Sequence, residues 1–190
     1  MASFHENGQP YVNTEHLFDF SQKFIDEYFP HCIEMARAFI QPKYQSAQAG
    51  RKALFALDNL WEGIGGLVAK DPSVKYLSGK VTIYSSSPET SRKAMVYYLD
   101  KYFGDREGLL KSKNPETWTP EQAEMFENMF TGEDYKENYL ILNNFVKSLG
   151  DTIPPLIHSY IWLSPSMKTF GTTFDPDFGD CYDTAMMITI

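Results

Sequence analysis

The chain has 190 residues, 43% of them hydrophobic and 15% aromatic, which is enough to bury a substantial core in one domain or a small pair of domains. Its formal net charge of -8 and its isoelectric point near 5.0 argue against a general nucleic-acid binder, which presents a basic face. Because the sequence opens without a secretory hydrophobic region and reaches no run of roughly 18 apolar residues, we expect a cytoplasmic protein.

The cysteines and histidines do not indicate a metal site. Cys32 and Cys181 lie far apart and match no metal-binding or redox spacing, so we interpret them as buried thiols. The four histidines are scattered and form no HExxH pattern, which argues against zinc. We therefore expect chemistry that needs no resident metal or cofactor.

The first elements come after a polar lead. Residues 1–14 contain few apolar side chains, and we expect them to be disordered. Ser21 is a candidate N-cap for a short helix over residues 22–28, which Pro30 ends. From residue 32 to residue 40 the pattern has a period of two, which predicts a strand.

This strand carries a carboxylate among small residues. Glu34 shares one face with Ala36 and Ala38, which leaves room for a substrate beside it, and Arg37 lies on the opposite face. The alternative, which the pattern leaves open, is that Glu34 points to solvent at the end of the strand. A charge in a central strand needs a partner or a function.

A loop of small polar residues separates this strand from a predicted helix over residues 53–69. The amides of such a loop and the first N–H groups of the helix are unpaired, so they can bind an anion. The residues that we expect to line this anion cradle are Tyr44, Gln45, Ser46, Gln48, Gly50, Arg51 and Lys52. Residues 76–84 are predicted to form the next strand, which completes a βαβ unit with parallel or splayed neighbouring strands.

The second half of the chain adds helices and two closing strands. We expect a helix over residues 91–103 and a helical insertion over residues 104–155, with helices around 120–130 and 134–149. The insertion carries an apolar stripe that fits either a core or a lid over a fatty chain, formed by Met125, Phe126, Met129 and Phe130. Residues 167–174 and 185–190 are predicted strands.

The segment between these two strands, FDPDFGDCYD, contains four aspartates. Clustered carboxylates are compatible with calcium, but the spacing lacks the order of an EF-hand and its terminal glutamate. Turn formation is the simpler interpretation.

Several motifs together resemble a known family. Residues 40–54 (IQPKYQSAQAGRKAL) are similar to the acyl-donor motif of the GNAT superfamily of N-acetyltransferases. The wider pattern resembles the ornithine-lipid and glycine-lipid N-acyltransferases, a group also labelled haemolysins, and more distantly the acyl-homoserine-lactone synthases. That pattern consists of Glu34-Met35-Ala36-Arg37, Trp61-Glu62-Gly63 and Phe174-Asp175-Pro176-Asp177-Phe178.

The resemblance implies a GNAT-like mixed sheet flanked by helices and a defined reaction. A long, commonly 3-hydroxylated fatty acyl group would move from acyl carrier protein, or from acyl-coenzyme A, to the amino group of a small amino acid. Glu34 and Arg37 would be the catalytic pair, and Glu34 would orient or deprotonate the amine. The residues of the anion cradle would hold the phosphopantetheine arm of the donor, and Tyr84 or Tyr160 would protonate the leaving thiolate.

The sequence differs from the family pattern in two ways. Gln45 stands where the family has an arginine, which favours a carrier-protein donor over free coenzyme A. The superfamily has three strands and two helices ahead of the Glu34 strand, so residues 15–190 are expected to be the C-terminal part of a larger acyltransferase-like domain. A non-catalytic binding or assembly domain remains the alternative function, and a homodimer and peripheral contact with a membrane remain open.

Overall fold

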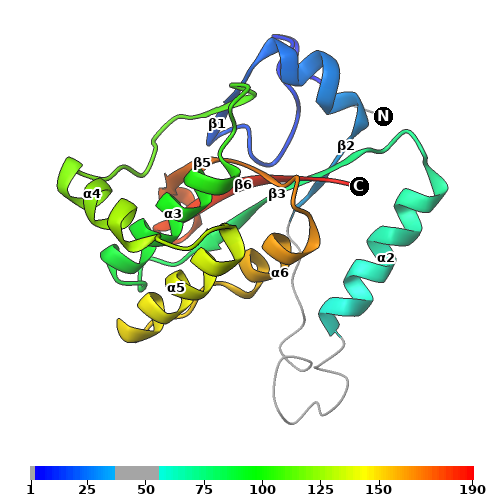
Figure 1. Cartoon of the computed structure of the whole chain (residues 1–190). Coiled ribbons are helices and arrows are strands. Elements are labelled where there is room, and N and C mark those ends of the chain that lie inside the picture. The colour runs from blue at the N-terminus through cyan, green and yellow to red at the C-terminus, as the bar shows by residue number, and fades with distance from the viewer. Residues whose placement is uncertain (1–2, 37–55) are drawn as a thin grey trace.

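The computed structural model describes residues 3–36 and 56–190 (Figure 1). Its centre is a four-stranded sheet in the order β2-β3-β6-β5, in which β2 and β3 are parallel and the other pairs are antiparallel. The strands are β2 (Cys32–Met35), β3 (Tyr76–Ile83), β5 (Lys168–Asp175) and β6 (Cys181–Thr189). The predicted mixed α/β architecture and the parallel pairing across the βαβ unit are confirmed.

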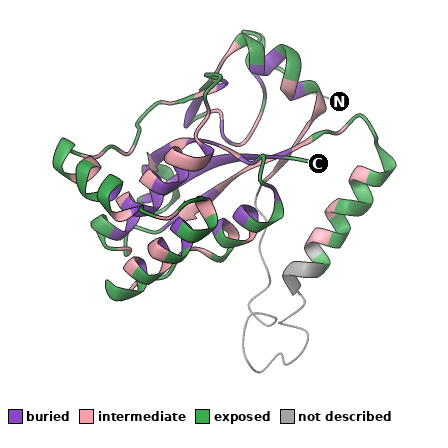
Figure 2. Cartoon of the chain, in the orientation of Figure 1, coloured by how far each residue is buried: buried purple, intermediate pink, exposed green. Residues whose placement is uncertain are grey.

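Helices cover one face of this sheet. They are α3 (Glu89–Phe103), α4 (Pro120–Met129), α5 (Tyr135–Ser148) and α6 (Pro155–Leu163). Helix α2 (Ala56–Lys70) stands to the side, where the ring of Trp61 packs against Tyr160 of α6 (Figure 1). Figure 1 shows α3, α5 and α6 gathered on the same side of the strands, where Val81 and Ile83 of β3 join the helices in one large core. Figure 2 shows the result, with buried residues along the strands and on the inward sides of the helices.

The N-terminal region covers the opposite face. Strand β1 (Phe18–Phe20) pairs antiparallel with β4 (Leu110–Ser112), and between β1 and β2 the chain forms a π-helix, η1 (Phe24–Tyr28), followed by the 3-10 turn η2 (Phe29–His31). A second, smaller core lies between these elements and the sheet. Its buried members are Leu17, Phe18, Phe24, Phe29, Leu109, Phe170, Ala185 and Met187.

The short helical segment after Ser21 begins as predicted. The hydroxyl of Ser21 accepts a hydrogen bond from the Phe24 N–H at 3.2 Å. The helix then widens to π geometry rather than continuing as an α-helix, and Pro30 lies within the 3-10 turn that follows. Glycine in a strand interior often marks a close approach of two backbones, and Gly79 does so here, because a Cβ at that position would lie 2.9 Å from the carbonyl oxygen of Met35.

The predicted helical insertion contributes to the main core. Helix α4 begins with a capping box between Thr119 and Gln122, and α4 and α5 pack on α3. Phe126 and Phe130 are buried in the core, whereas Met125 is 42% exposed. The core interpretation of the stripe is therefore confirmed for the two phenylalanines and wrong for Met125.

The aspartate-rich segment forms a turn. Asp175 accepts a hydrogen bond from the Asp177 N–H at 3.1 Å at the start of the 3-10 turn η5 (Pro176–Phe178), and Gly179 and Asp180 follow with positive φ. The turn interpretation is confirmed for these residues. Asp183 lies beyond the turn, inside β6.

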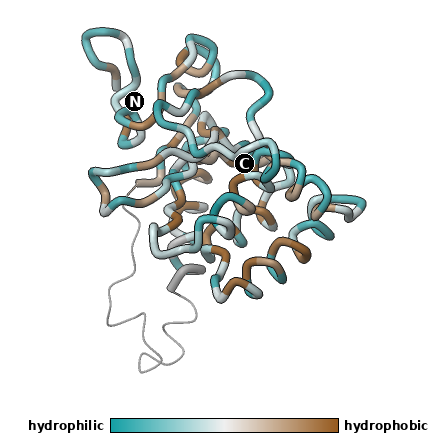
Figure 3. Tube along the Cα trace, turned by 90° about the vertical axis from the view of Figure 1, so that its left-hand side faces the viewer, coloured by the Kyte–Doolittle hydropathy of each residue, from teal (hydrophilic) through white to brown (hydrophobic). Residues whose placement is uncertain are grey.

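Residues 3–14 make defined contacts although the sequence predicts a disordered lead. Phe4 bridges to Pro10, and the Asn13 and Thr14 backbone binds the side chain of Glu34. This stretch is largely hydrophilic, as Figure 3 shows near the label N. Over the described residues, no helix combines the length and the apolar character needed to cross a membrane.

Candidate functional site

Glu34 lies on the sheet face that the N-terminal region covers. The alternation of β2 turns Met35 toward the helix-side core and Glu34 toward the opposite side, as the period of two predicts. In the parallel pairing of β2 with β3, Glu34 is in register with Ser78. Glu34 thus lies on the face predicted from the alternation, and its role as a site residue stays a prediction.

The carboxylate of Glu34 is held by three donors from one short segment. The Asn13 N–H donates to Oε2 at 2.7 Å, and the N–H and the hydroxyl of Thr14 both donate to Oε1 at 3.1 Å. Thr14 begins a helical turn, because its carbonyl accepts from the Leu17 and Phe18 N–H groups. The N–H groups at the start of such a turn have no partner within it, and this explains why they bind an anion.

Within the described part of the chain, three donors bind Glu34. An ionised carboxylate offers about four acceptor positions, and these donors use three of them. All three donors are neutral, so the negative charge is stabilised but not cancelled. The carboxylate is thus an oriented anion that can attract an ammonium group.

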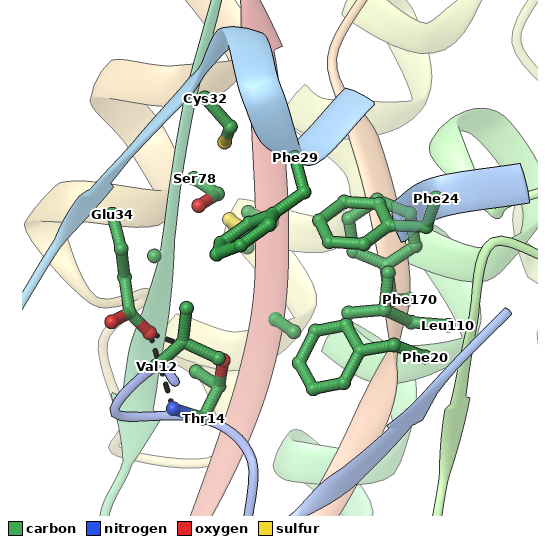
Figure 4. Close-up of a pocket in the computed structure, with 13 residues that line it drawn as sticks. Val12, Thr14, Phe20, Phe24, Phe29, Cys32, Glu34, Ser78, Leu110 and Phe170 are labelled. Carbon is green, nitrogen blue, oxygen red and sulfur yellow. Dashed lines mark hydrogen bonds between the residues drawn. The ribbon is translucent and has the colours of Figure 1, made fainter. Parts of the chain in front are cut away.

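A narrow pocket adjoins Glu34 (Figure 4). It lies between the four-stranded sheet and the region formed by η1, η2 and the β1–β4 pair, and it has room for only about one or two water molecules. Figure 4 shows polar side chains on one side, Glu34, Thr14, Ser78 and Cys32, and apolar ones on the other, Phe20, Phe24, Leu110 and Phe170. The site therefore combines a carboxylate with an apolar recess.

Cys32 lines the pocket but is not an activated nucleophile. Burial raises the pKa of its thiol, and the nearby charge of Glu34 acts in the same direction. A thiol with a raised pKa stays protonated at neutral pH. The other cysteine, Cys181, is fully buried, and burial raises the pKa of its thiol to about 11.

A second polar cluster lies on the same sheet face. Lys80 of β3 contacts Asp183 of β6 at 2.5 Å and Asp175 of β5 at 3.0 Å, and both aspartate side chains are at most 1% exposed. Burial opposes the charge of Lys80, yet its hydrogen bonds to Asp183 and Asp175 prevail and raise its pKa. Burial likewise opposes the charge of Asp175, but the hydrogen bond from Lys80 prevails and lowers the pKa of that carboxyl.

The predicted donor-binding residues all lie outside the described residues, as does the predicted catalytic partner Arg37. The donor-binding residues are Tyr44, Gln45, Ser46, Gln48, Gly50, Arg51 and Lys52. Of the two candidate proton donors, Tyr84 is 67% exposed, and Tyr160 is buried on α6 against the ring of Trp61. Burial raises the pKa of Tyr160.

Asn13 and Thr14 are site residues that the sequence analysis missed. They precede Glu34 by about 20 positions, in a stretch that reads as a disordered lead. One local signal was available. Threonine is a common first residue of a helical turn, and Thr14 stands three and four positions before Leu17 and Phe18. That signal identifies the turn but not the anion that it binds.

Comparison with known proteins adds a similarity that runs from end to end. The chain is 43% identical over 189 residues to a glycine N(alpha)-acyltransferase of Phocaeicola vulgatus, which covers 100% of this chain and 58% of that protein. It is 44% identical over 187 residues to a glycine N(alpha)-acyltransferase of Bacteroides thetaiotaomicron, covering 98% and 55%. No family model and no solved structure matches it. The chain is thus similar along its whole length to just over half of two glycine N(alpha)-acyltransferases.

Proposed function

We propose that this protein is an N-acyltransferase that transfers a long-chain fatty acyl group from a phosphopantetheine thioester to the amino group of glycine. The donor is acyl carrier protein, and the acyl group is commonly 3-hydroxylated. The single observation that carries the proposal is Glu34, whose carboxylate is oriented by three neutral donors beside an apolar pocket. The similarity to the two glycine N(alpha)-acyltransferases supports the reaction class and the acceptor.

The proposed chemistry needs the proton of an ammonium group to be removed. Glu34 accepts this proton from glycine, directly or through a water, so that the neutral amine can attack the carbonyl carbon of the thioester. A C–N bond forms and the C–S bond breaks, the nitrogen loses its second proton, and the leaving thiolate takes up one proton. The proton accepted by Glu34 passes to solvent, so the products are an N-acyl amino acid, a free thiol and one proton, and no redox partner is needed.

The three donors keep the carboxylate of Glu34 in one orientation. The Asn13 and Thr14 N–H groups hold one oriented carboxylate geometry through each cycle, because they belong to the backbone of a turn rather than to mobile side chains. Positioning of this kind matters because a displacement of about 1 Å can cost about a hundred-fold in rate.

The test is thiol release from acyl carrier protein by the full-length protein that the gene encodes, with and without glycine. We expect glycine-dependent thiol release and a mass-verified N-acylglycine product. Glu34→Gln keeps the size of the side chain but removes the base, so the rate should fall by about 10² to 10⁴.

Glu15→Gln is the matched control. Glu15 lies in the same N-terminal segment and binds the Val12 N–H and His5, so it tests general damage to this region. Its variant should keep near wild-type activity. Full activity in Glu34→Gln would remove Glu34 from the mechanism, and no glycine-dependent thiol release in the wild type, together with saturable binding of an acyl-phosphopantetheine, would favour a non-catalytic binding domain.

A further inference from the structure

The segment that binds Glu34 crosses the sheet face and is anchored at two places. At one end the Asn13 and Thr14 N–H groups donate to Glu34 of β2. Two residues further on, Nε2 of His16 lies 3.4 Å from Oδ2 of Asp175 in β5. In the order β2-β3-β6-β5 these carboxylates belong to the first and the last strand of the four-stranded sheet. The segment therefore connects two strands that do not pair with each other.

The contact between His16 and Asp175 has a defined direction. Lys80 lies 3.0 Å from the same oxygen of Asp175 and holds that carboxyl in its ionised form. An ionised carboxylate only accepts hydrogen bonds, so Nε2 of His16 carries the hydrogen and donates it. Lys80 also contacts Asp183, so one ammonium faces two carboxylates that are at most 1% exposed. Asp175 is therefore a strong acceptor for the ring of His16, which is itself 43% exposed.

His16 lies within the helical turn that presents the donors to Glu34. The carbonyl of Thr14 accepts hydrogen bonds from the Leu17 N–H at 3.0 Å and the Phe18 N–H at 3.2 Å, which closes the turn around His16. Leu17 and Phe18 are buried in the smaller core and fix where the turn lies. The contact of His16 fixes how the turn is rotated on that core. Rotation matters because a hydrogen bond weakens steeply as its donor turns away from the acceptor.

We propose that His16 is a positioning residue for the proposed reaction. By donating to Asp175, it holds the turn at the rotation at which the Asn13 and Thr14 N–H groups point at the carboxylate of Glu34. The inference rests on the proposed function and adds to it a side chain that acts on the base without touching substrate. Loss of the contact leaves the buried core of the turn in place but frees its rotation.

The first test uses this chain, with amide hydrogen exchange followed by NMR. His16→Leu removes the donor, whereas His16→Gln places a side-chain amide nitrogen where Nε2 of the histidine lies and so retains it. We expect exchange of the Asn13 and Thr14 amides to become about five-fold faster in His16→Leu, as for the loss of about one hydrogen bond. In His16→Gln it should stay within about two-fold of wild type.

The chain supplies two controls for this experiment. At the start of α5 the Lys136 and Glu137 N–H groups bind the carboxylate of Asp134 at 2.8 and 2.9 Å, and their exchange should be the same in every variant. His5→Leu is the matched variant, because His5 also contacts a carboxylate, that of Glu15, at 2.7 Å, but lies outside the turn. It should leave the amides that bind the base unchanged.

The second test measures acyl transfer by the full-length protein that carries the same substitutions. In His16→Leu we expect kcat to fall by about five-fold, with the KM for glycine changed by less than about two-fold and an unchanged midpoint of chemical denaturation. His16→Gln should restore kcat. A residue that only stabilises the fold would instead lower the denaturation midpoint.

The outcomes distinguish this inference from the proposed function. Wild-type exchange in His16→Leu, or equally fast exchange in His16→Gln, would overturn the positioning role even if the protein forms N-acylglycine. An unfolded or clearly less stable His16→Leu would also overturn it, because His16 would then act on folding. Fast exchange in His16→Leu that His16→Gln reverses, in a protein that forms no N-acyl product, would support the anchoring of the turn and overturn the transferase.

Discussion

Two carboxylate sites occupy the same face of the four-stranded sheet and are held in opposite ways. Glu34 is bound by two backbone N–H groups and one hydroxyl, all of them neutral. Asp175 and Asp183 are bound by the ammonium of Lys80 and are almost completely buried. The segment 13–16 contacts both sites, because Thr14 binds Glu34 and the His16 ring lies 3.4 Å from Asp175.

We interpret Glu34 as the proposed site of chemistry and the Lys80 cluster as a stabilising site. Asp175 and Asp183 share one partly buried lysine, which weakens their attraction for another cation, and removing that lysine leaves two buried carboxylates without their cation. A carboxylate held by neutral donors keeps its full charge in a fixed orientation. We therefore expect substitutions at the Lys80 cluster to act mainly on folding and substitutions around Glu34 to act mainly on transfer.

The largest expected effect is at Lys80. Lys80→Met leaves Asp175 and Asp183 without their cation, and the free energy of unfolding should fall by about 3 to 5 kcal/mol. Chemical denaturation measures this. Lys101→Met is the control, because its partner Glu127 is 60% exposed and such surface pairs contribute at most about 1 kcal/mol. Equal losses in the two variants would contradict the comparison.

A smaller effect is expected at Thr14. Thr14→Val keeps the shape of the side chain and both backbone N–H groups but removes the hydroxyl donor to Glu34. Loss of one hydrogen bond of about 1 kcal/mol should lower the rate of acyl transfer by about five-fold with little change in unfolding. Thr14→Ser retains the hydroxyl and should restore the rate. If Thr14→Val lowered stability as much as Lys80→Met, the two sites would not differ as described.

The smallest effect concerns a third carboxylate, at the surface. Glu107 accepts hydrogen bonds from Lys168, Lys23 and Tyr28, which lower its pKa to about 2. Because this pKa is depressed in the folded state, the stabilisation is present above the unfolded value near pH 4.5 and is lost as the pH falls toward 2.

Glu107→Gln tests this smallest effect. The variant should reduce the free energy of unfolding by less than about 1 kcal/mol at pH 7, since solvent and salt screen the group. It should also flatten the fall in stability between pH 4.5 and 2, measured by denaturation at stepped pH values. A variant that leaves the acid slope unchanged would show that these contacts are not formed in solution.

Some expectations from the sequence followed directly from local periodicity. The alternation around Glu34 placed it opposite Met35, and the helical spacings of residues 120–130 and 134–149 placed two helices where the structure has α4 and α5. These predictions succeeded because strand and helix geometry fix which neighbouring side chains share a face, whatever the rest of the chain does.

Only the tertiary structure decided how the site is assembled. The donors to Glu34 come from residues 20 and 21 positions away, and the pocket joins side chains of β1, η1, η2, β2, β3, β4, β5 and β6. Lys80 meets Asp175 across 95 positions of sequence. Such contacts depend on strand order and on which face the N-terminal region covers, and no local pattern specifies either. By itself the sequence identified a carboxylate on a strand face, and the fold surrounded it with neutral donors and an apolar pocket.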